Sequence, residues 1–274
     1  MEKVTQLGIG SFCYPFAIGT GKMVPKNPMT AWDMVDRAKE LEVKVVQIAD
    51  NYPLTGLGRE ALENLSAYAR ENGISIEVGM RGLFEENLET YLKISKILNS
   101  KLLRCVIDLG TYRPDLFQIK DILSKYRTRF EKDDLVFGIE NHDRFPTSVF
   151  QKIMEDNRDE RIGIVLDTVN SFACEENSSQ VIGALGKYTV NFHVKDYEIK
   201  RCNEQMGLRV TGTIAGQGFL KIPEMLKQLR AEAQTDFSSI LELWMEPCET
   251  AEETVAKEQL WVKQSVQYLK NYII

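Results

Sequence analysis

Eight short apolar or alternating runs, each followed by a stretch of helical periodicity, organise this chain of 274 residues. Alternating or continuous apolar character over a few residues indicates strands, and apolar residues every three to four positions indicate helices. The predicted strands span residues 4–10, 43–49, 75–80, 102–107, 135–140, 163–167, 190–194 and 239–243. The predicted helices span residues 30–41, 59–72, 85–99, 115–130, 147–156, 178–187, 222–233 and 250–272. Eight such repeats favour a parallel sheet that closes into a barrel.

We therefore expect an α/β fold, a (β/α)₈ TIM barrel, formed by a single domain over residues 1–274. A doubly wound open sheet has the same alternation and is the alternative. Two features favour the barrel: no Gly-x-Gly-x-x-Gly follows the first predicted strand, and polar residues stand at the ends of four separate strands. The longest irregular segments, 11–29 and 197–220, are expected to lie over the catalytic face.

Composition narrows the class of partner. The formal net charge of -6 without a basic stripe argues against nucleic acid. No segment is long and apolar enough to span a bilayer, and the N-terminus has no signal-peptide core. Five widely spaced cysteines without a Cys-x-x-Cys pair indicate reduced thiols. We expect a cytoplasmic protein with a small-molecule partner and no membrane or nucleic-acid partner; a homo-oligomer is left open.

Polar residues stand where the last four apolar runs end: Glu140, Asp167, His193 and Glu242. A barrel gathers the carboxyl ends of its strands on one face, where three carboxylates and one imidazole would suit one divalent cation. A lone carboxylate at a strand end is as often a helix cap, but four such residues together favour a metal site. Glu246, four residues further on, competes with Glu242 for the last ligand position.

Several segments carry a family resemblance: 139–142 (Ile-Glu-Asn-His), 166–170 (Leu-Asp-Thr-Val-Asn), 192–196 (Phe-His-Val-Lys-Asp), 241–243 (Leu-Glu-Leu) and the glycine-rich 212–220. They resemble the xylose-isomerase-like TIM-barrel superfamily, and more closely its sugar phosphate isomerase/epimerase branch. The resemblance implies Glu140, Asp167, His193 and Glu242 as metal ligands, with Glu140 and Glu242 also moving protons. Asn170 stands where the epimerases have a histidine, which disfavours a ketose epimerase.

The residue types suggest a mechanism. A divalent ion (Mn²⁺, Mg²⁺, Co²⁺ or Zn²⁺) polarises a carbonyl and stabilises an enediolate, and nearby carboxylates remove or return a proton. Glu140 and Glu242 are the candidate catalytic residues. The candidate substrate-binding residues are His142, Asn170, Lys195 and Arg209. Asp50 and Asn51 end the second predicted strand, where we expect them to cap a turn.

The leading hypothesis is a metal-dependent isomerase or epimerase of a keto-sugar or sugar acid. The alternative is a decarboxylase or lyase of a 3-oxo sugar acid or keto-glycoside, which needs the same site and is favoured by Asn170 with the cations Lys195 and Arg209. A DNA-repair endonuclease of this fold needs a histidine-rich trinuclear zinc cluster, and the chain has 2 histidines. A non-catalytic sugar-binding module is disfavoured by the four-ligand set.

Overall fold

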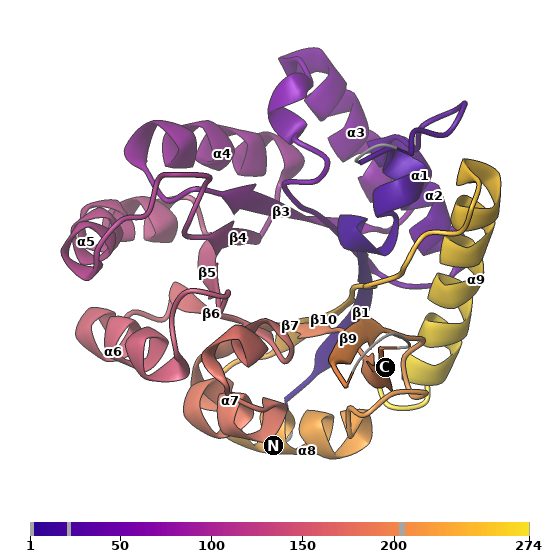
Figure 1. Cartoon of the computed structure of the whole chain (residues 1–274). Coiled ribbons are helices and arrows are strands. Elements are labelled where there is room, and N and C mark those ends of the chain that lie inside the picture. The colour runs from indigo at the N-terminus through magenta and orange to yellow at the C-terminus, as the bar shows by residue number, and fades with distance from the viewer. Residues whose placement is uncertain (1–2, 21–22, 203–205, 274) are drawn as a thin grey trace.

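The computed structural model describes residues 3–20, 23–202 and 206–273 of the chain. Eight parallel strands close into a barrel in the order β1-β10-β7-β6-β5-β4-β3-β2, and helices surround them (Figure 1). The predicted barrel is thereby confirmed over the open sheet. The strands of the barrel are β1 (Thr5–Gly10), β2 (Val45–Ile48), β3 (Ser75–Arg81), β4 (Leu102–Val106), β5 (Val136–Glu140), β6 (Ile162–Asp167), β7 (Thr189–Val194) and β10 (Phe237–Leu241).

The helices follow the predicted stretches closely except α1, which lies in the predicted irregular segment 11–29. They are α1 (Pro15–Ile18), α2 (Ala31–Glu40), α3 (Arg59–Glu71), α4 (Glu85–Leu98), α5 (Leu116–Lys132), α6 (Thr147–Asn157), α7 (Ser178–Leu185), α8 (Ile222–Glu232) and α9 (Ala251–Leu269). Thr30 caps α2 through the amide of Asp33, and Thr250 caps α9 through the amide of Glu253. None of the helices in the described ranges has the length and apolar character needed to cross a membrane.

Strand ends differ from the predictions where the backbone finds partners outside the barrel. The second strand was predicted over 43–49 but spans only Val45–Ile48. The amide of Val43 donates to the carbonyl of Ala38 at the end of α2, and the amide of Ala49 donates to the Ser11 hydroxyl. Both amides are therefore used in turns, which shortens the strand at each end.

The two long connections that follow β1 and β7 were predicted to be irregular, but both contain regular secondary structure. Segment 11–29 contains the 3₁₀ turn Ser11–Cys13 and the short helix α1. The prediction of an irregular 197–220 was wrong at β8 (Tyr197–Arg201) and β9 (Leu208–Gly212), which pair as an antiparallel hairpin. Residues 203–205 and 21–22 lie outside the described residues.

Candidate metal centre

Four adjacent strands carry the predicted ligands. Glu140 is the last residue of β5, Asp167 is the last of β6, His193 is the penultimate residue of β7, and Glu242 directly follows β10. The strands β5, β6, β7 and β10 are consecutive neighbours in the barrel, and Asp167 pairs in register with His193. The topology therefore places all four side chains along one half of the barrel mouth.

Their polar atoms converge on one point. His193 Nδ1 lies 3.6 Å from Glu140 Oε2, 3.9 Å from Asp167 Oδ2 and 3.5 Å from Glu242 Oε1. Glu140, Asp167 and His193 each offer one atom within 4.8 Å of the others. All four residues are at most 2% exposed. This is the geometry of a small site for a cation, in which each residue contributes one atom.

Three of these atoms have no hydrogen-bond partner among the described residues: Asp167 Oδ2, His193 Nδ1 and Glu242 Oε1. A buried polar atom without a partner costs about 1–3 kcal/mol. Three such atoms facing one another are an arrangement that a bound cation would satisfy in one step. Because oxygen and imidazole nitrogen suit the divalent ions from Mg²⁺ to Zn²⁺, the donor set fits a divalent metal without selecting one.

Lys195 lies in front of the same carboxylates. Its Nζ is 2.7 Å from Asp167 Oδ2, without the alignment of a hydrogen bond, and 2.9 Å from Glu242 Oε2. Burial alone would lower the pKa of Lys195, but the charges of Asp167 and Glu242 raise it above its ordinary value. Lys195 is therefore an ammonium group in contact with two of the candidate ligands, and its predicted contact with a substrate stays a prediction.

Glu140 differs from Glu242 in its hydrogen bonds. Arg104 Nε donates to Glu140 Oε2 at 2.5 Å, and Asn170 Nδ2 donates to Oε1 at 2.8 Å. Burial would raise the pKa of Glu140, but Arg104, followed by His193 and Lys195, lowers it well below the usual range. Both oxygens of Glu140 are thus engaged as acceptors by donors that favour the ionised form.

The opposite half of the mouth holds a group of residues that the sequence analysis missed. Arg104, on β4, is 2% exposed, and its Nη1 donates to Asp50 Oδ1 at 2.7 Å. Arg81, at the end of β3, donates to Asp50 Oδ2 at 2.8 Å. Asp50 is therefore an ion-pair partner of two arginines and not the turn cap that was expected. Arg104 is a charged residue inside the apolar run 102–107, and that position could have indicated a functional role from the sequence.

The other predicted substrate-binding residues lie at different distances from the centre. His142 is partly exposed, with Nε2 3.4 Å from an Arg81 nitrogen, and Asn170 contacts Glu140 directly. Arg209 lies on β9, where its exposed side chain pairs with Glu246 at 3.0 Å. Glu246, the competing candidate for the last ligand position, therefore pairs with Arg209, and Glu242 is the carboxylate beside His193. A substrate contact by Arg209 stays a prediction.

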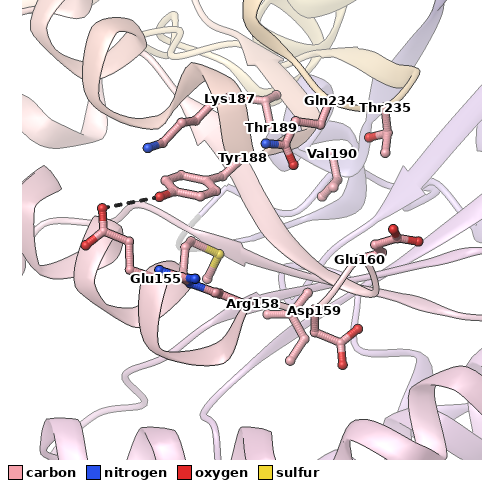
Figure 2. Close-up of a pocket in the computed structure, with 12 residues that line it drawn as sticks. Glu155, Arg158, Asp159, Glu160, Lys187, Tyr188, Thr189, Val190, Gln234 and Thr235 are labelled. Atoms are coloured by element: carbon pink, nitrogen blue, oxygen red, sulfur yellow. Dashed lines mark hydrogen bonds between the residues drawn. The ribbon is translucent and has the colours of Figure 1, made fainter.

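A separate hollow of about 730 Å³ lies at the other end of the barrel, where β6 and β7 begin (Figure 2). Figure 2 shows Tyr188 donating to Glu155 across it, at 3.5 Å. Enzymes of this architecture carry their chemistry at the carboxyl ends of the strands. The hollow lies at the amino ends, so we give it no part in the candidate site.

The fold and this site define the class of protein. The chain belongs to the xylose isomerase-like TIM barrel family, whose model matches residues 35–272. A 3-oxo-isoapionate decarboxylase of Pectobacterium atrosepticum is 27% identical over 263 residues, which cover 96% of this chain and 95% of that protein. The family predicted from the sequence motifs is thereby confirmed.

Solved structures share the fold at low sequence identity. D-psicose 3-epimerase from Clostridium cellulolyticum, solved with D-tagatose, superposes with a TM-score of 0.70 at 15% identity, covering 98% of this chain and 99% of that one. A xylose isomerase-like protein from Mycobacterium smegmatis, solved in complex with magnesium, gives a TM-score of 0.68 at 11% identity, covering 96% and 97%. These likenesses establish the architecture alone.

Proposed function

We propose that this protein is a divalent-metal-dependent decarboxylase of a 3-oxo sugar acid. The observation that carries the proposal is the difference between the two glutamates of the centre. Glu140 accepts hydrogen bonds on both oxygens from Arg104 and Asn170, whereas Glu242 has a free Oε1 and shares its Oε2 with Lys195. An epimerase needs proton transfer on two faces of its substrate. A decarboxylase needs it on one, which this asymmetry supports.

The metal would be held by Glu140, Asp167, His193 and Glu242, because one oxygen of each carboxylate lies 3.5–3.9 Å from His193 Nδ1. When bound, a divalent cation supplies a Lewis acid for the keto oxygen of the substrate. Mn²⁺, Mg²⁺, Co²⁺ or Zn²⁺ as the native ion stays a prediction. The partly exposed donors Arg81 and His142 are available at the mouth for the acidic end and hydroxyls of the substrate.

The proton that completes the reaction would come from the side of Glu242 and Lys195. In a 3-oxo acid the bond between the carboxylate carbon and C2 breaks, and its electron pair forms a double bond between C2 and C3 while the C3 oxygen takes up negative charge. Carbon dioxide leaves, and one proton is then added at C2 to restore the ketone. Glu242 is the proposed donor of that proton, and Lys195, at 2.9 Å from it, is positioned to resupply the proton.

Two further points support decarboxylation over the isomerase or epimerase that led the sequence analysis. The relative with 27% identity over nearly the whole chain is named as a 3-oxo acid decarboxylase, whereas the epimerases are matched at fold level only. Asn170, which stands where the epimerases have a histidine, is used here to hold Glu140. We further propose that residues 1–274 act as one domain on a small-molecule substrate. A cytoplasmic location stays a prediction.

The test is a direct assay of metal-loaded protein on two sets of compounds. The first set contains 3-oxo-isoapionate and 3-oxo acids of linear sugars, and the second contains the corresponding ketoses. We expect release of carbon dioxide from a member of the first set, dependent on added divalent metal and absent in Asp167→Asn. Epimerisation of the ketoses without carbon dioxide release from any acid would contradict the proposal and restore the epimerase.

A further inference from the structure

A hydrogen-bonded network of polar side chains fills the barrel interior next to His193. It consists of Gln47 on β2, Glu77 on β3, Asn191 on β7 and Ser238 on β10. Asn191 lies two residues before His193, so both side chains point into the barrel from the same strand. Gln47, Asn191 and His193 are fully buried. A buried polar network of this kind has to be fully hydrogen-bonded to be stable, which makes its orientation informative.

The carboxylate of Glu77 accepts every hydrogen bond it makes in this network. Its Oε2 accepts from Gln47 Nε2 and from Asn191 Nδ2, each at 3.0 Å, and its other oxygen accepts from the Ser238 hydroxyl. Gln47 Nε2 faces a second acceptor as well, because Asn191 Oδ1 lies 3.3 Å from it. An amide that faces two acceptor oxygens has to present its NH₂ group to them. Glu77 and Asn191 therefore set which end of the Gln47 amide faces His193.

The opposite end of the same amide meets His193. Gln47 Oε1 lies 2.8 Å from His193 Nε2. Since Oε1 is an acceptor only, Nε2 has to carry a proton and donate it. The remaining ring nitrogen, Nδ1, is then free to present a lone pair, and it is the atom that lies 3.5 Å from Glu242 Oε1 without a hydrogen bond.

We propose that Gln47, oriented by Glu77, is a positioning residue that fixes the His193 ring with its proton on Nε2 and its lone pair on Nδ1 facing the metal centre. Histidine ligands commonly donate their second nitrogen to a carboxylate or a carbonyl, which fixes the tautomer and raises metal affinity. Here an amide stands between the histidine and the carboxylate. Without Gln47, three nearby carboxylates would attract the proton to Nδ1, where it would block metal binding. The purpose of this arrangement rests on the proposed metal site, but the arrangement itself is independent of the reaction.

The experiment uses the small number of histidines in the chain. With only His142 and His193 present, nitrogen-15 NMR of the imidazole groups in magnesium-loaded protein gives two ring systems, and His142→Ala assigns them. We expect a His193 Hε2 signal protected from solvent exchange in the wild type. Gln47→Leu should lose that protected signal and bind Mg²⁺ about 10–100-fold more weakly by calorimetry, the range found for such outer partners. Gln151→Leu, the same change on α6 away from the centre, should alter neither.

Glu77→Gln is the second variant, and it keeps the shape of the side chain. Because an amide at position 77 no longer dictates which end of Gln47 faces His193, the protected Hε2 signal should weaken and metal affinity should fall. Absence of a protected His193 Hε2 in the wild type, or Mg²⁺ affinity within about twofold of wild type in Gln47→Leu, would overturn the proposal. If Gln47→Leu does not fold by circular dichroism, an unchanged signal and affinity in Glu77→Gln would overturn it instead. Failure to find a decarboxylase activity would leave these readouts untouched.

Discussion

The two halves of the barrel mouth differ in how their polar side chains are paired. At the ends of β5, β6, β7 and β10, the side chains present acceptor atoms to one another, and three of these atoms make no hydrogen bond to the described residues. Asp50 just after β2, Arg81 at the end of β3 and Arg104 within β4 form ion pairs of 2.7–2.8 Å with one another. Converging acceptors of the first kind would be satisfied by a bound cation. Mutually paired charges instead hold their neighbours in place, and Arg104 joins the two halves by reaching Glu140.

The connection after β1 lies at one seam between these halves, because β1 stands between β10 and β2. Its Ser11 accepts a hydrogen bond from the amide of Ala49 beyond β2, and the carbonyl of Phe12 accepts one from Leu243 beyond β10. Glu258 of α9 anchors the connection from outside by accepting from the amides of Phe16 and Ala17. This connection therefore contacts both halves of the barrel mouth, the one with the four candidate ligands and the one with Asp50, Arg81 and Arg104, as well as the outer helix layer.

Removing a metal ligand should have the largest effect. Asp167→Asn or His193→Ala deletes one of four donors that the remaining three cannot replace, so we expect nearly complete loss of bound divalent metal. Elemental analysis of purified variants measures it. Asp134→Asn, an equivalent change at an exposed ion pair, is the control and should retain the ion. Undiminished metal in both ligand variants would remove Asp167 and His193 from the centre.

The next effect concerns the two glutamates. At saturating metal, Glu242→Gln should lower turnover by about 10²–10⁴-fold, the usual contribution of a general acid–base group. Glu140→Gln should act mainly through metal binding and lose much less once metal is saturating, because Glu140 is held by Arg104 and Asn170. Steady-state kinetics over a metal titration separates the two contributions. Equally large losses in both variants would favour proton transfer on two faces, as in an epimerase.

Replacing Arg104 tests how much the ion pairs with Asp50 and Glu140 stabilise the fold. Replacing it by methionine leaves the buried carboxylate of Glu140 and that of Asp50 without their shared cation, and breaking a buried ion pair typically costs about 3–5 kcal/mol. Urea unfolding of the metal-free protein measures the loss. Arg37→Met breaks a surface pair with Glu40 and should cost no more than about 1 kcal/mol. A loss for Arg104→Met no larger than that of the control would show that its pairs contribute little.

The smallest effect is a pH dependence at the seam. Burial raises the pKa of Glu258 from 4.5 to about 7 in the folded protein. The folded chain then binds this proton more tightly than the unfolded chain, so the stability it contributes is present below about pH 4.5 and lost as pH rises through 7. The interval corresponds to roughly 3 kcal/mol. Unfolding free energies of wild type and Glu258→Gln at several pH values measure it. A difference between them that does not change with pH would contradict the assignment.

The sequence carried enough information to predict that the four candidate ligands meet, and too little to predict the ion pairs of Asp50, Arg81 and Arg104. Glu140, Asp167, His193 and Glu242 each follow an apolar run, so strand positions alone bring them together. Asp50 and Arg104 come from different strands and meet only because β2, β3 and β4 are adjacent, and an aspartate after a strand is more often a cap. The tautomer of His193 depends on Gln47 and Glu77, and both residues are far from His193 in the sequence. Long-range pairing of polar side chains inside a barrel is set by register, which periodicity does not give.

Proton transfer on one face alone is the central claim, and solvent deuterium tests it most directly. Metal-loaded protein is incubated in D₂O with a 3-oxo sugar acid that it decarboxylates, and the ketose product is examined by mass spectrometry and NMR. We expect one deuterium per carbon dioxide released, on a single face of the former C2, and no epimer of the product. Deuterium entering a ketose together with epimer formation, without release of carbon dioxide from any acid, would contradict it.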